Sequence, residues 1–172
     1  MSKALVSLIL LALATPLSAQ AQVGGDFEAM AGACEAFVAE GRFPPASAEA
    51  SFFLEKGFKS AASTVQTNEV SRTYTSSGTP IDPVRIMVAR RSEPGGESCS
   101  VLDLNGPEAG DGYIAKARTE PTWTFDSDSN DVNGKGVLFT KNVAESVIYM
   151  AIWGTGGAYP ISVATYQIGT SD

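Results

Sequence analysis

The sequence predicts a single α+β domain in which one or two N-terminal helices pack on a mainly antiparallel β-sheet, fastened by one disulfide bond. Three observations predict this fold class. Apolar residues recur with helical spacing near the N-terminus, the period changes to two after Asn68, and the C-terminal third is rich in β-branched and aromatic residues. The chain has 172 residues, of which 44% are hydrophobic and 18% charged, a composition typical of one globular domain. Residues 22–172 are therefore assigned to one domain.

The first 21 residues have the three parts of a secretory signal peptide. Lys3 supplies a positive charge, an apolar run covers residues 4–14, and Ala19-Gln20-Ala21 fits the A-x-A cleavage pattern. The run is well short of the roughly 20 residues that a membrane-spanning helix needs. We therefore expect cleavage before Gln22, with cleavage after Ala19 as the alternative, and no membrane span. The expected location is the periplasm or the extracellular space of a bacterium.

Cys34 and Cys99 are the two cysteines of the chain. In an oxidising compartment an even pair has one possible intramolecular pairing, so we expect a Cys34–Cys99 disulfide bond. A redox-active cysteine usually lies in a C-x-x-C pair or beside a cationic activator, whereas Cys34 is flanked by Ala33 and Glu35. The sequence therefore favours a structural disulfide over a redox centre.

Two helices are expected near the N-terminus. From Asp26 to Glu40 the apolar residues are spaced three, four and seven apart, which places them on one helical face. These residues are Phe27, Met30, Cys34, Phe37 and Val38. A second, short helix is expected from Ala46 to Lys56, where Gly57 ends it. Residues 59–68 show no usable period.

Strands follow, with one weak helix among them. A Pro-Gly-Gly turn at residues 94–96 favours an antiparallel hairpin, and Cys99 lies in its second arm. A weak helix is expected from Glu108 to Arg118, interrupted by two glycines. The run Ser146–Trp153 is nearly all apolar, which is typical of a central strand covered on both faces. The expected strands are 70–74, 84–91, 98–104, 122–125, 136–141, 145–153 and 161–168.

The most suggestive polar segment is a candidate calcium site. Carboxylate and amide oxygens at nearly alternate positions suit a hard cation, and here they belong to Asp126, Asp128, Asn130 and Asp131. An EF-hand loop starting at Asp126 fails twice, because Asp131 stands where glycine is needed and Val137 where glutamate is needed. The competing interpretation is a solvated loop between strands, whose polar side chains satisfy turn backbone.

Trp153 and Tyr159 are the candidate ligand-binding residues. They flank a glycine-rich segment that lacks both the G-x-G-x-x-G spacing and the ending of a P-loop. The two aromatic rings would form a stacking platform for a ligand. The competing interpretation is that they close the end of the hydrophobic core. No cofactor is assigned.

The chain contains no histidine, which excludes Ser-His-Asp and Cys-His nucleophiles and imidazole metal ligands. The net charge of −7 disfavours a nucleic-acid partner. Adjacent Arg90 and Arg91 form no stripe with aromatic residues, so we expect them to decorate strand edges. No catalytic residue is assigned.

These observations favour a small exported, non-catalytic protein that binds another protein or a small ligand in the cell envelope. One alternative is a glycosidase-like hydrolase with paired carboxylates drawn from Glu108, Asp111, Asp103 or the Asp126–Asp131 segment. A second alternative is a redox or chaperone-like envelope factor, which would need a readily reducible Cys34–Cys99 bond.

Overall fold

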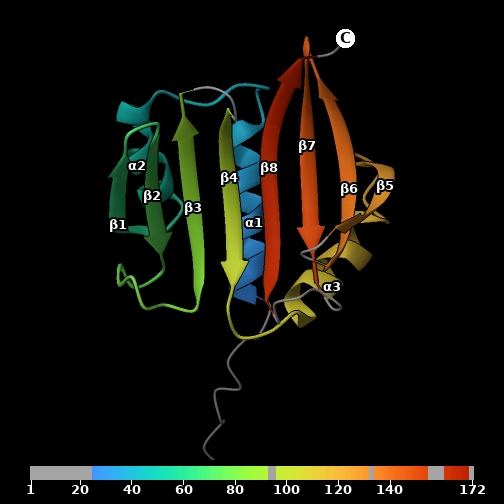
Figure 1. The fold of residues 1–172 in the computed structure, drawn as a ribbon, viewed down its shortest axis with the longest axis horizontal. Coiled ribbons are helices and arrows are strands. Elements are labelled where there is room, and N and C mark those ends of the chain that lie inside the picture. The colour runs from blue at the N-terminus through green and yellow to red at the C-terminus, as the bar shows by residue number, and fades with distance from the viewer. Residues whose placement is uncertain (1–24, 93–95, 132–133, 155–160, 171–172) are drawn as a thin grey trace, which may run out of the picture.

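The computed structural model describes residues 25–92, 96–131, 134–154 and 161–170. Within these ranges the chain forms three helices and one eight-stranded sheet (Figure 1). The helices are α1 (Gly25–Val38), α2 (Ala46–Glu55) and α3 (Glu108–Ala117). The strands are β1 (Lys59–Gln66), β2 (Glu69–Thr75), β3 (Val84–Arg91), β4 (Glu97–Asp103), β5 (Thr124–Asp131), β6 (Gly134–Val143), β7 (Ser146–Trp153) and β8 (Ser162–Thr170).

The sheet has the order β1-β2-β3-β4-β8-β7-β6-β5, and every neighbouring pair is antiparallel. It consists of two four-stranded meanders, β1–β4 and β5–β8, joined through their last strands. Helices α1 and α2 precede the first meander, and α3 precedes the second. The predicted α+β class, antiparallel sheet and disulfide are confirmed. The molecule is mostly sheet, and its third helix was indicated only weakly by the sequence.

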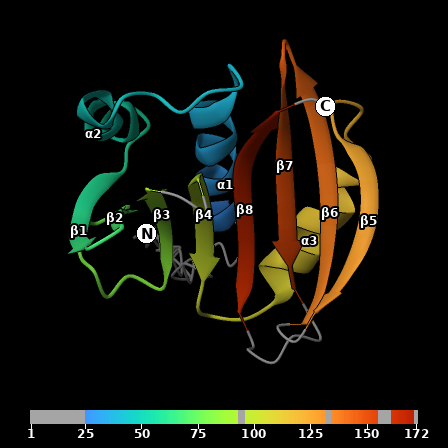
Figure 2. The same cartoon turned by 45° about the horizontal axis from the view of Figure 1, so that its top comes forward.

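Helix α1 lies across the seam between β4 and β8 (Figure 2). All five apolar residues that the sequence placed on one helical face are buried: Phe27, Met30, Cys34, Phe37 and Val38. Burying a large apolar side chain stabilises the fold by about 1.5–3 kcal/mol. Cys34 forms the predicted disulfide with Cys99 on β4. The bond ties the helix to the strand at the centre of the sheet.

The two faces of the sheet differ in burial. On β7, Ile148, Met150 and Ile152 are fully buried beneath the helices, whereas Tyr149 between them is 36% exposed. Successive strand residues point to opposite faces, so Tyr149 lies on the face that no described helix covers. The expectation that both faces of this strand are covered was therefore wrong. An antiparallel sheet commonly packs one face on the core and leaves the other face in contact with water.

The two edge strands differ most from the sequence-based expectations. Strand β1 forms where no periodicity was found, and most of its residues are exposed. Strand β5 continues through Asp131, although residues 126–131 were expected to form a loop. An edge strand needs only backbone pairing on one side and buries few side chains. Neither strand therefore carries a strong hydrophobic alternation in its sequence.

Helix α3 runs without interruption through Gly110. The glycine is needed there for a close contact between the helix and the end of β7. A Cβ atom at position 110 would lie 2.4 Å from the carbonyl oxygen of Trp153 at the end of β7. The Gly110 N–H also donates to the Ser162 hydroxyl at 2.7 Å. Glycine thus lets the first turns of α3 sit directly against the ends of β7 and β8.

Residues 1–24 lie outside the described ranges, so the signal peptide and its cleavage point stay predictions. Among the described helices, none has the length and apolar character needed to cross a membrane.

The disulfide is expected to contribute a large share of the stability. Cys34 and Cys99 are 65 residues apart, a loop whose closure removes about 4 kcal/mol of denatured-state conformational freedom. The double variant Cys34→Ala/Cys99→Ala should therefore unfold with a free energy lower by about 4 kcal/mol. Equilibrium urea denaturation of both proteins measures this difference. A loss below about 1 kcal/mol would contradict the assigned role.

Candidate functional site

A pocket of about 420 Å³ lies between α1 and α3. This volume falls within the range of about 300–1,000 Å³ that small-molecule sites occupy. We call it the α1–α3 pocket. Its floor comes from α3, the following turn and β7, its wall from α1, and its rim from charged residues of both helices and the turn.

The floor of the α1–α3 pocket consists of buried side chains, namely Tyr113, Ala117, Trp123 and Met150. The Tyr113 and Tyr166 hydroxyl groups share a hydrogen bond of 2.8 Å. Burial raises the pKa of Tyr113 to about 12 despite this hydrogen bond, and it also raises the pKa of Tyr166 well above its usual value. Both phenols are therefore neutral at physiological pH, and the floor carries no formal charge.

Small residues create the space above this floor. Ala29 and Gly32 lie one turn apart on α1, outside its buried stripe, and they line the pocket opposite Ala117 of α3. A Cβ atom at Gly32 would meet no other atom within 4 Å. The cavity thus exists because these positions carry little or no side chain.

Charged residues surround the opening. Glu28 pairs with Lys116, and Glu35 accepts a hydrogen bond of 3.0 Å from the Lys141 ammonium of β6. In the part of the chain that the structure describes, the side chain of Glu120 makes no hydrogen bond or ion pair. Among the described residues, the rim therefore has three carboxylates, and two ammonium groups pair with them.

The rim carboxylates act on the ionisable groups next to them. A hydrogen bond to Glu28 raises the pKa of Lys116, and the charges of Glu28, Glu120 and Glu35 raise it further. The same three carboxylates add to the effect of burial on the pKa of Tyr113. The negative potential thus extends from the rim to the floor of the pocket.

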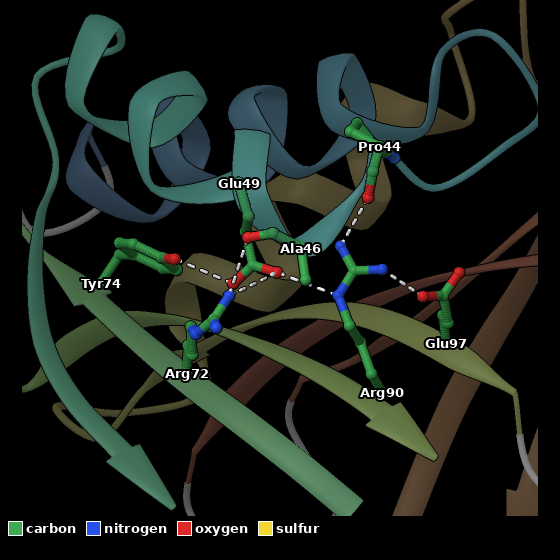
Figure 3. Close-up of polar contacts among 7 residues, drawn as sticks. All are labelled: Pro44, Ala46, Glu49, Arg72, Tyr74, Arg90 and Glu97. Carbon is green, nitrogen blue, oxygen red and sulfur yellow. Dashed lines mark hydrogen bonds and ion pairs between the residues drawn. The ribbon is translucent and has the colours of Figure 1, made fainter. Parts of the chain in front are cut away.

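A second polar group is centred on Glu49 of α2 (Figure 3). This carboxylate is only 1% exposed, accepts a hydrogen bond of 2.8 Å from the Tyr74 hydroxyl, and pairs with Arg90 at 3.1 Å and Arg72 at 3.7 Å. Burial raises the pKa of Tyr74, and the hydrogen bond to Glu49 adds to this effect. We call these four residues the Glu49 cluster.

The Glu49 cluster fastens the second helix to the first meander. Arg90 also donates to the Pro44 carbonyl at 2.7 Å and pairs with Glu97, while Arg72 donates to the Ala46 carbonyl at 3.0 Å. The expectation that Arg90 decorates a strand edge was wrong, because β3 directs it toward a buried carboxylate. None of the four cluster residues lines the α1–α3 pocket. The cluster has a structural role.

Trp153 of the predicted aromatic platform does not line the α1–α3 pocket. Trp153 ends β7 on the sheet face opposite the α1–α3 pocket, and its ring covers Gly136, where a Cβ would lie 2.6 Å from the indole nitrogen. That nitrogen is buried without a hydrogen-bond partner in the described residues. Tyr159 lies outside the described residues. The Trp153–Tyr159 site therefore stays a prediction.

The candidate calcium ligands belong to edge strand β5. Asp126 and Asp128 are exposed, and Asp128 pairs with Arg118 at 3.2 Å. The side chains of Asn130 and Asp131 lie outside the described parts. Among side chains that the structure does describe, no cluster of three or more acidic or cysteine ligands is positioned to hold a metal ion. The calcium site stays a prediction.

The carboxylates of the hydrolase hypothesis lie in two places: Asp103, Glu108 and Asp111 at or shortly before the start of α3, and the Asp126–Asp131 segment on β5. Asp103 is buried and accepts the Asn105 N–H at 2.8 Å, while Glu108 and Asp111 lie in the first turn of the helix. None of them lines the α1–α3 pocket. The pocket is lined instead by Glu28, Glu35 and Glu120, which no sequence pattern singled out. Their one sequence signal is the seven-residue spacing of Glu28 and Glu35 beside Ala29 and Gly32.

Comparison of the chain with protein-family models, curated proteins and solved structures finds no match. We therefore describe the class of this protein from its architecture alone. It is an α+β protein with an antiparallel eight-stranded sheet, a central disulfide and a pocket between two helices.

The Glu49 cluster makes a strong prediction about stability. Glu49→Ala leaves two arginines without their buried partner, so it should lower the free energy of unfolding by about 3–5 kcal/mol. Tyr74→Phe removes only one hydrogen bond and should cost about 1 kcal/mol. Urea denaturation measures both values. Glu55→Ala, at an exposed position of the same helix, is the control, and an equal loss in it and in Glu49→Ala would refute the assigned role.

The tyrosine pair predicts loss of stability in alkali. The folded-state pKa of Tyr113 is raised from 10 to about 12. The stability that the buried neutral phenol contributes is therefore fully present below pH 10 and is lost as the pH rises to about 12. Between pH 10 and pH 12 the free energy of unfolding of the wild type should fall by roughly 2 kcal/mol more than that of the Tyr113→Phe variant. Urea denaturation at several pH values tests this. Parallel loss in both proteins would contradict it.

Proposed function

We propose that this protein is a small exported binding protein that takes up a small ligand in the α1–α3 pocket without catalysing a reaction. The observation that carries this proposal is the pocket itself. It combines a volume of about 420 Å³ with a buried aromatic floor and a charged rim. Concave sites of this size, mainly apolar with a few polar groups, are where proteins bind small molecules.

Export is part of the proposal. Residues 1–21 have the layout of a signal peptide, and a buried Cys34–Cys99 disulfide suits the oxidising conditions of the periplasm or the extracellular space. In such a protein, α1 is held on the sheet by the disulfide and supplies a stable wall for the pocket. A pre-formed wall reduces the entropy lost when a ligand binds.

The state of the rim carboxylates supports binding over hydrolysis. Glu28 and Glu35 each have an ammonium partner, so both carboxylates are engaged in ion pairs. The floor offers the neutral phenol of Tyr113 and the indole of Trp123, which provide contact area for a ligand. The hydrolase alternative rests on other carboxylates, none of which lines the pocket.

Filling the pocket should abolish binding without unfolding the protein. A leucine at Gly32 has open space and would occupy the cavity, whereas a leucine at Gly112 has equally open space on α3 outside the pocket lining. Both replace a helical glycine and should raise stability by about 0.5–1 kcal/mol. Thermal unfolding checks that both variants are folded.

Binding is measured by ligand-observed NMR with three probes that share one ring: phenethylamine, 2-phenylethanol and phenylacetate. At least one should bind the wild type and the Gly112→Leu variant, and its affinity should fall at least about tenfold in Gly32→Leu, a loss of about 1.4 kcal/mol. Absence of binding by all three, or equal binding by both variants, would refute the proposed function.

A further inference from the structure

We propose that the ligand of the α1–α3 pocket is a small organic cation: a protonated amine attached to an apolar body. This inference rests on the proposed function and names the class of ligand for the same pocket. It follows from the charge around the rim, the potential that this charge creates, and the aromatic groups of the floor.

The rim has an excess of negative charge. Lys116 and Lys141 neutralise Glu28 and Glu35, and Glu120 remains without a hydrogen bond or ion pair in the described parts of the chain. Glu120 lies in the turn that follows α3, and Trp123 of the floor belongs to the same turn. The backbone N–H of Trp123 donates to the backbone carbonyl of Glu120 at 3.2 Å. An unpaired carboxylate thus stands beside the aromatic floor.

Two groups of the protein report the sign of the potential. The three rim carboxylates favour the charged form of Lys116, so they stabilise a cation at the rim. They also disfavour ionisation of Tyr113, so they oppose an anion at the floor. A ligand that enters the pocket passes both positions. A positive ligand gains from this field, and a negative ligand loses.

The floor shows how a cation is accommodated. The Lys141 ammonium lies 5.5 Å from the centre of the Trp123 ring, which is within the range of a cation–π contact. Indole binds cations best among the aromatic side chains. The remaining floor residues, Tyr113 and Met150, offer buried apolar surface to the hydrocarbon part of an amine.

The three NMR probes share a phenyl ring and carry a positive ammonium, a neutral hydroxyl and a negative carboxylate group respectively, so they test this inference directly. At low ionic strength phenethylamine should bind the wild type about two- to fivefold more tightly than 2-phenylethanol, because an ion pair with the exposed Glu120 carboxylate contributes up to about 1 kcal/mol. Phenylacetate should bind most weakly. Added salt should weaken phenethylamine binding and leave 2-phenylethanol unchanged.

Charge variants assign the effect to the rim. Glu120→Gln keeps the shape of the side chain and should weaken phenethylamine about three- to fivefold, with no change for 2-phenylethanol. Glu55→Gln removes an exposed carboxylate of α2 that does not line the pocket and should change neither affinity. Equal effects of Glu120→Gln and Glu55→Gln would overturn the inference.

The outcomes separate this inference from the proposed function. If 2-phenylethanol or phenylacetate binds as tightly as phenethylamine, and Gly32→Leu abolishes that binding, the pocket is a binding site but the ligand class is wrong. If no probe binds the wild type, or Gly32→Leu has no effect, both proposals fail. Preference for phenethylamine that is lost in Gly32→Leu and reduced in Glu120→Gln supports both.

Discussion

The packing of α1 across the seam between β4 and β8 is the constraint on which the rest of the structure depends. Within the sheet, the two meanders meet only through this pair of strands. Helix α1 contacts β3 and β4 of the first meander and β8 of the second, and the Cys34–Cys99 bond ties it to β4. The helix therefore braces the joint between the two halves. Because the same helix forms a wall of the α1–α3 pocket, the packing of the core also fixes the position of the pocket.

The protein uses its carboxylates in two physically different ways. Glu49 is almost fully buried, and a charge in that position is tolerated only because two arginines and a tyrosine hydroxyl surround it. The rim carboxylate Glu120 is exposed, and water there lowers the cost of an unbalanced charge. Excess negative charge can therefore accumulate at the pocket and not inside the fold. A chain with 19 acidic and 12 basic residues has the surplus to do this.

The fold was predictable where one side of an element is buried against a core. The apolar stripe on α1 marks such a face, and the ranges of α1 and β3 in the structure agree closely with those expected from the sequence. Strand β1 was missed and β5 was expected to be shorter than it is. An edge strand is held mainly by backbone hydrogen bonds, which depend little on side-chain identity, so its sequence carries a weak signal. The candidate site was not predictable for a related reason. Its space comes from Ala29, Gly32 and Ala117, and absent side chains produce no signal in a sequence.

The amino-acid sequence by itself determined the pairing of the two cysteines, the buried face of α1 and the exclusion of imidazole chemistry. Each of these follows from residue identity or from spacing within one segment. Only the tertiary structure decided that Arg90 meets Glu49 across 41 residues and that Glu28 of α1 meets Lys116 of α3 across 88. The order in which antiparallel strands assemble places these residues together. That order arises from the burial of many weakly specific apolar contacts at once, which no local pattern encodes.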